Sequence, residues 1–123
     1  MKTVKQKGEY DCGVACVAML ADVAYDEAVE AIFPNGRRVG KTKTNALRDA
    51  LVKLGRQPDA GRRKPFGSTV LDDLTGDALV FVMLDDDGDE YHHWMVWDAK
   101  ARELRDPYKR KLPYRLRGYL LVG

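Results

Sequence analysis

The chain has 123 residues, 45% of them hydrophobic and 33% charged, with a formal net charge of +2. This composition is typical of a single soluble globular domain, and the net charge is too small to argue for nucleic-acid binding. Two cysteines are too few for a disulfide scaffold, and no stretch approaches the roughly 18 apolar residues of a membrane span. The polar start, MKTVKQKGEYD, gives no export signal, so we expect a cytoplasmic location and reduced thiols.

The region after the polar lead-in predicts a first helix. Residues 1 to 10 have the pattern of an extended segment, whereas apolar residues recur at helical spacing from residue 14 to residue 21. Asp11 is a suitable N-cap, because aspartate can accept hydrogen bonds from the free N–H groups of the first turn. Gly13 lies in that turn, and its small size would permit close packing against a neighbouring segment.

Two further helices are expected in the first half of the chain. Residues 25 to 33 have a helical pattern with Asp26 as the expected cap, and the Pro-Asn-Gly that follows would end this helix. Residues 43 to 55 predict a third helix that Thr44 or Asn45 caps and a glycine terminates. The apolar stripe expected for the third helix consists of Leu47, Leu51, Val52 and Leu54.

The second half has the pattern of an antiparallel sheet. Residues 78 to 84, ALVFVML, form a continuous apolar run that predicts a central strand, and the acidic residues 85 to 90 predict a turn. Further strands are expected at residues 91 to 98 and 117 to 123, and a tight turn leads from the first of these into residues 102 to 107. Because helices come first and strands follow, with no linker between them, we expect one domain of the α+β class.

Cys12 is the candidate nucleophile. It lies in the first turn of the expected helix, where free N–H groups and the helix dipole favour the thiolate that attacks a carbonyl. Cys16 lies one turn further along within the apolar positions, so it is the better core residue. A buried structural thiol at Cys12 is the alternative, since free cysteines are often buried. A disulfide between the two would strain the helix, and their spacing with the histidines fits no common zinc pattern.

A cysteine nucleophile needs a base, and the two histidines of the chain are adjacent, His92 and His93. Adjacent side chains on a strand point to opposite faces, so only one of the two histidines can face Cys12, and the alternation alone leaves both open. Asp106 follows His93 by 13 residues, and a neighbouring strand would bring it against the imidazole as the orienting group. The alternative for Asp106 is a turn carboxylate before Pro107, a common arrangement.

Acyl transfer also needs hydrogen-bond donors for the developing oxyanion. Gln6 lies six residues before Cys12 and can offer a side-chain N–H, and the backbone N–H of Cys12 can offer a second. The alternative for Gln6 is a solvated side chain near the N-terminus.

These residues lie in motifs that resemble one known family. Gln6 ahead of DCGVACVAML, then HWMVW at residues 93 to 97, then Asp-Pro at residues 106 to 107, is similar to the double-glycine peptidase family. Its members are papain-like cysteine peptidase domains that process bacteriocin leader peptides, usually at the N-terminus of peptide-exporting ABC transporters. The segment at residues 41 to 60 also resembles the middle helix of this family, so the similarity covers nearly the whole chain. The local signature of papain itself is absent.

The resemblance implies a papain-like fold over residues 1 to 123, with N-terminal helices packed on a C-terminal antiparallel sheet. By position, Cys12 matches the nucleophile, His93 the general base and acid, and Asp106 the orienting acid. Gln6 matches the oxyanion donor. The implied reaction is cleavage of an extended peptide after small residues of the Gly-Gly type, and it requires no metal or organic cofactor.

The resemblance also implies the partners of the chain. They are a peptide or protein substrate, held in a narrow groove walled by aromatics such as Trp94, and a peptide-exporting ABC transporter. No transporter sequence follows Gly123, so the alternatives are an excised domain and a stand-alone relative. We favour the stand-alone relative, for which the transporter is a separate partner. We expect no nucleic-acid partner. Two alternatives remain open: a non-catalytic peptide-binding module of the same fold, and a deamidase, transglutaminase or isopeptidase that uses the same three residues.

Overall fold

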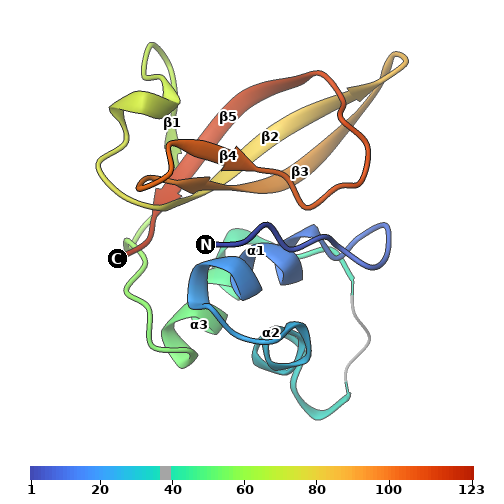
Figure 1. Cartoon of the computed structure of the whole chain (residues 1–123), viewed down its shortest axis with the longest axis vertical. Coiled ribbons are helices and arrows are strands. Elements are labelled where there is room, and N and C mark those ends of the chain that lie inside the picture. The colour runs from blue at the N-terminus through green and yellow to red at the C-terminus, as the bar shows by residue number, and fades with distance from the viewer. Residues whose placement is uncertain (37–39) are drawn as a thin grey trace.

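Three α-helices lie on one side of a five-stranded antiparallel sheet in the computed structural model, which describes residues 1–36 and 40–123 (Figure 1). The helices come from the first half of the chain and the sheet comes mainly from the second half. The predicted α+β class is therefore confirmed. Within the described residues, no helix has both the length and the apolar character needed to cross a membrane.

Helix α1, Cys12–Ala21, is the central helix, and eight of its ten residues are buried. It is followed by α2, Tyr25–Ile32, and α3, Thr44–Lys53. The helices lie where the apolar periodicity predicted them, because the burial of one apolar face decides where a short helix forms.

Asp11 occupies the N-cap position of α1 as predicted, although its side chain makes no cap hydrogen bond, and the caps predicted for α2 and α3 were wrong. Ala24, in an extended conformation, occupies the N-cap position of α2. Asp26 lies in the first turn, where the helix dipole still stabilises a carboxylate. Lys43 occupies the N-cap position of α3, one residue before the expected Thr44. Val52 is 58% exposed, and the core face of α3 uses Ala50 instead.

The five strands have the spatial order β1-β5-β2-β3-β4. They are β1 (Lys64–Pro65), β2 (Ala78–Asp86), β3 (Asp89–Asp98), β4 (Glu103–Arg105) and β5 (Tyr114–Leu121). The apolar run of β2 forms the central strand, as predicted. The acidic turn is tighter than predicted: Asp87 and Gly88, with φ of 54° and 92°, make a two-residue connection, and β2 and β3 pair up to it.

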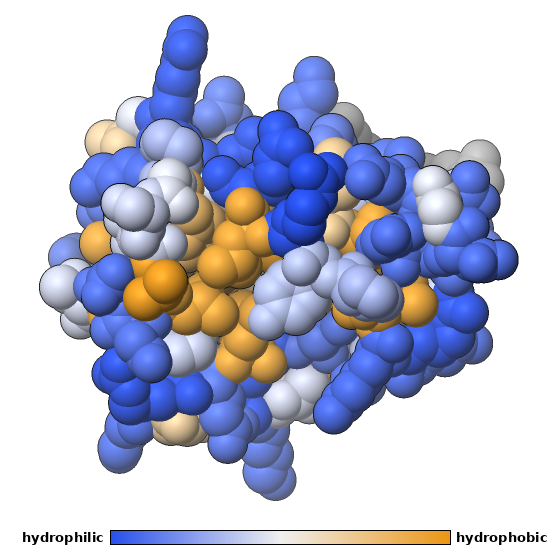
Figure 2. All heavy atoms as spheres, turned by 90° about the horizontal axis from the view of Figure 1, so that it is seen from above, coloured by the Kyte–Doolittle hydropathy of each residue, from blue (hydrophilic) through white to orange (hydrophobic). Residues whose placement is uncertain are grey.

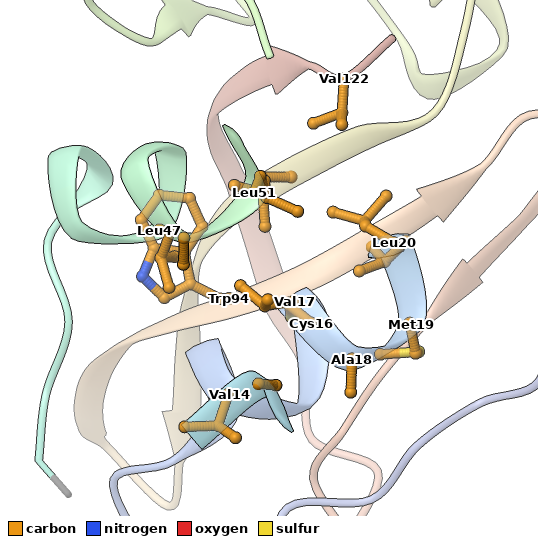
Figure 3. Close-up of a cluster of buried hydrophobic side chains, with 14 of the residues drawn as sticks. Val14, Cys16, Val17, Ala18, Met19, Leu20, Leu47, Leu51, Trp94 and Val122 are labelled. Carbon is orange, nitrogen blue, oxygen red and sulfur yellow. The ribbon is translucent and has the colours of Figure 1, made fainter. Parts of the chain in front are cut away.

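Two hydrophobic clusters flank the sheet. The first lies between the sheet and the helices and joins Leu79, Trp94 and Val96 to side chains of α1 and α3. Figure 3 shows Trp94 together with residues of both helices. The second includes Val80, Val82 and Met95 and lies on the opposite face. Viewed from the sheet side, hydrophobic side chains gather at the centre of that face within a hydrophilic surround (Figure 2). The alternation of strand residues between the two faces explains the continuous apolar run of β2.

Candidate active site

Cys12 is the first residue of α1, and its side chain is partly exposed. The first N–H groups of a helix have no partner within the helix, so Cys12 lies where the backbone offers free hydrogen-bond donors. Cys16, one turn later, is fully buried, and burial raises the pKa of its thiol well above the usual range. The two cysteines therefore have the different environments that the sequence predicted.

His93 lies on β3, is 5% exposed, and is paired with Asp106. Its Nε2 atom is 2.8 Å from Oδ1 of Asp106. With Nε2 committed to this carboxylate, Nδ1 is the ring nitrogen left for another partner. His92, the neighbour in sequence, is exposed, and its ring lies tilted against Phe81 with 4.8 Å between ring centroids. The strand thus directs the two imidazoles to different environments, as predicted.

The charge state of His93 depends on both of its partners. Burial opposes the charged ring, but the hydrogen bond to Asp106 and the influence of the Cys12 thiol outweigh burial and raise the pKa of His93 from 6.5 to about 9. Cys12, His93 and Asp106 therefore form one connected series of side chains, although they come from a helix, a strand and a loop.

Asp106 is held by its own turn as well as by His93. Its Oδ1 atom also accepts a hydrogen bond from the backbone N–H of Tyr108, at 2.9 Å, which is an Asx turn across Pro107. Asp106 is therefore a turn carboxylate and a histidine partner at once. Tyr108 was not singled out in the sequence, although an aspartate two residues before it is the signal for such a turn.

The N-terminal segment lies along the loop that carries Asp106 and is hydrogen-bonded to it (Figure 1). The Lys5 ammonium donates to the backbone carbonyls of Asp106, at 2.9 Å, and Tyr108, at 3.1 Å. The backbone N–H of Gln6 donates to the carbonyl of Pro107, at 2.9 Å. The polar lead-in is therefore part of the site region, because it lies along the loop next to His93.

The side chain of Gln6 is turned into the loop that precedes α1. Its Nε2 atom donates to the carbonyl of Gly8, at 2.8 Å, and to the carbonyl of Glu9, at 3.2 Å. Its Oε1 atom is buried and has no hydrogen-bond partner among the described residues. An amide nitrogen has two N–H donors, and both are used within the loop. The oxyanion role of Gln6 remains a prediction.

Trp94 lies in the hydrophobic cluster under the helices (Figure 3). Its ring is 3% exposed, and its Nε1 atom donates to the carbonyl of Thr42, at 3.3 Å. A ring that is almost fully covered offers a peptide little surface, so the structure does not bring Trp94 into the candidate site.

The arrangement suits nucleophilic catalysis by a thiol: a cysteine at a helix N-terminus, a buried imidazole beside it, and a carboxylate that orients the imidazole. Within residues 1–36 and 40–123, no group of three or more histidine, cysteine or acidic side chains is placed to hold a metal ion. In comparisons with known proteins, no family model matches the chain and no curated protein matches its sequence. The resemblance to double-glycine peptidases therefore rests on the motifs.

Proposed function

We propose that this chain is a cysteine peptidase with a papain-like fold, in which Cys12, His93 and Asp106 form the catalytic triad. One observation carries the proposal: a buried imidazole is hydrogen-bonded to a carboxylate, and a thiol at the start of a helix, together with that carboxylate, raises its pKa. A His93–Asp106 pair with only a structural role would not need a thiol near it. A Cys12 with only a structural role would not need that pair.

The reaction follows from the order of these groups. His93 takes the thiol proton, and the thiolate of Cys12 attacks the carbonyl carbon of the scissile peptide bond. The carbon–nitrogen bond then breaks as His93 returns the proton to the leaving amine, which leaves a thioester on Cys12. Water, deprotonated by His93, hydrolyses the thioester and restores the thiol. Asp106 keeps the ring in the orientation that both proton transfers require.

The oxyanion of the tetrahedral intermediate needs donors that are already in place. The backbone N–H of Cys12 lies at the free end of α1 and is one of them. Gln6 supplies the second by releasing one of its two bonds within the loop. The bond to the carbonyl of Glu9, at 3.2 Å, is the longer of the two and is the one expected to yield.

The substrate and the partner come from the resemblance. The expected substrate is an extended peptide that is cut after a Gly-Gly type sequence, and the expected partner is a peptide-exporting ABC transporter.

Alkylation by iodoacetamide tests the proposal without a known substrate. The rate is measured against pH at Cys12 and Cys16 separately by mass spectrometry. Cys12 is expected to react rapidly below pH 7 and to lose this reactivity in His93→Ala, whereas Cys16 stays inert. His92→Ala is the matched control and should leave the profile unchanged. A Cys12 that reacts only above pH 8, or no faster than Cys16, would remove the chemical basis of the proposal.

A fluorogenic peptide amide with Gly-Gly before the reporter then separates a peptidase from a binding module. Cys12→Ala should abolish release of the reporter and keep peptide affinity, measured by fluorescence anisotropy of a labelled Gly-Gly peptide. A wild-type chain that binds the peptide without cleaving it would favour the non-catalytic module instead.

A further inference from the structure

Asp11 lies at the N-cap position of α1, but its side chain does not cap the helix. Its carboxylate instead accepts hydrogen bonds from the backbone N–H of Lys7, at 3.0 Å, and of Gly8, at 2.7 Å. The hydroxyl of Tyr25, at the start of α2, donates a third bond to the same carboxylate. Asp11 is 6% exposed, so a buried charge is devoted to fixing the chain just before the nucleophile.

The two backbone groups that Asp11 fixes belong to the loop that holds Gln6. Asp11 binds the N–H of Gly8, and the carbonyl of Gly8 binds the side-chain amide of Gln6, at 2.8 Å. A Cβ atom at Gly8 would lie 3.3 Å from Oδ1 of Asp11, so the close approach favours a glycine there. The carboxylate and the amide are therefore linked through one residue.

Packing does little to hold this loop. Residues 7 to 10 are exposed, and with Tyr25, Asp26 and Val29 they border an open hollow beside α2. Burial tends to raise the pKa of Asp11, but the bonds from Tyr25, Lys7 and Gly8 outweigh it and lower the pKa. The carboxylate stays ionised near neutral pH, and its hydrogen bonds hold the backbone of Lys7 and Gly8 in place.

We propose that Asp11 is a positioning residue for Gln6: by fixing Lys7 and Gly8, it places the amide that stabilises the oxyanion at Cys12. This inference rests on the proposed peptidase function. The contacts that join Cys12, His93 and Asp106 do not pass through the 7–10 loop. Loss of the Asp11 charge should therefore impair acyl transfer and leave the reactivity of the thiol intact.

The test is a double-mutant cycle on the acylation rate with acetyl-Gly-Gly p-nitrophenyl ester, followed by release of p-nitrophenol. Gln6→Ala should slow acylation about 100-fold, the usual cost of one oxyanion donor. Asp11→Asn keeps the shape of the side chain and should slow it about 10-fold or more, with KM within about twofold. The double variant should be no slower than Gln6→Ala, because Asp11 acts only through Gln6.

Alkylation of Cys12 by iodoacetamide supplies the second measurement. Its rate should not fall in Asp11→Asn, because alkylation forms no oxyanion and because the loss of a carboxylate beside Cys12 favours the thiolate. Asp26→Asn, the same chemical change at an exposed position of the same hollow, is the matched control and should alter neither rate. If Asp11→Asn fails to fold, Tyr25→Phe removes one of the three donors and enters the same cycle with Gln6→Ala.

Additive losses in the double variant, or a parallel loss of alkylation in Asp11→Asn, would overturn the positioning role and leave the proposed function standing. A wild-type chain that takes no acyl group from the ester would overturn the proposed function, and the inference with it. The two failures are therefore distinguished by which protein shows them, the variant or the wild type.

Discussion

Nε2 of His93 lies 2.8 Å from Oδ1 of Asp106, across 13 residues of sequence. The pairing of β3 with the short strand β4 returns the chain beside His93, and the turn at Pro107 directs the carboxylate toward the ring. The contact fixes which nitrogen faces the carboxylate and so which one remains for Cys12. The orientation of the base is therefore set by a hairpin and a turn, two local features of the backbone.

Asp106→Asn should separate the charge of this residue from its role in the turn. Asparagine can still accept the bond from Tyr108, but it no longer stabilises the imidazolium, so the pKa of His93 should fall. We expect alkylation of Cys12 at pH 6 to slow at least about 10-fold, and cleavage of the Gly-Gly amide to fall about 100-fold. Asp89→Asn, on the same strand as His93 but exposed, should change neither rate.

The stability of the fold should depend on the protonation of His93. Its pKa is raised from 6.5 to about 9, so the folded state holds the proton more tightly than the unfolded state. This contribution is fully present below about pH 6.5 and is lost as pH rises through about 9, with a total on the order of 3 kcal/mol. Urea unfolding between pH 6 and pH 10 measures it.

The control for this pH dependence is the neighbouring histidine. His92→Ala should keep the decline of the unfolding free energy between pH 6.5 and pH 9, whereas His93→Gln should flatten it. A wild-type chain whose stability is constant over this interval, or a decline that survives in His93→Gln, would contradict the assignment.

The fold was readable from the sequence where one local pattern decides the element. A continuous apolar run such as residues 78 to 84 has few alternatives to a central strand, and that strand is β2. The two-residue strand β1, Lys64–Pro65, has no pattern of its own, because it exists only by pairing with β5. Val52 was predicted on the core side of α3, but Ala50 is buried there and Val52 is exposed. A modest rotation of a helix about its axis decides which of these two positions faces the core, and no local pattern shows that rotation.

The candidate site could be predicted where the chemistry of a residue and its place in a helix or strand indicate the same role. The position of Cys12 before an apolar helix and the alternation of His92 and His93 both depend on local geometry, and both describe the structure. Trp94 could not be assigned in this way, because an aromatic residue on a strand fits a core and a groove equally well. The direction of the Gln6 amide depends on the loop fixed by Asp11, which no local pattern reveals.

Cys16 should matter for stability and not for reactivity. The side chain is fully buried in the hydrophobic cluster between the helices and the sheet, so Cys16→Ser places a hydroxyl in an apolar environment. We expect a loss of about 1–3 kcal/mol in the free energy of unfolding, measured in urea. Cys12→Ser, at a partly exposed position, should cost clearly less, and an equal cost at both positions would argue that Cys12 is a core residue too.

Gly13 directly follows the nucleophile, and Gly13→Ala should disturb the start of α1. An added Cβ would lie 2.9 Å from Cδ2 of Leu47 and would clash more severely with the hydroxyl of Thr42. The Thr42 segment cannot move freely, because its carbonyl accepts the bond from Trp94. We expect a loss of about 1–3 kcal/mol in the free energy of unfolding, as for other overpacked sites.

Two further variants show whether this clash is the cause. Gly76→Ala is the matched control, since no atom lies within 4 Å of its added Cβ, and it should be close to neutral. Thr42→Ala should rescue part of the Gly13→Ala loss. Oγ1 of Thr42 is buried without a hydrogen-bond partner among the described residues, so its removal costs little by itself. Equal destabilisation in Gly13→Ala and in the double variant would show that the cost lies elsewhere, for example against Leu47.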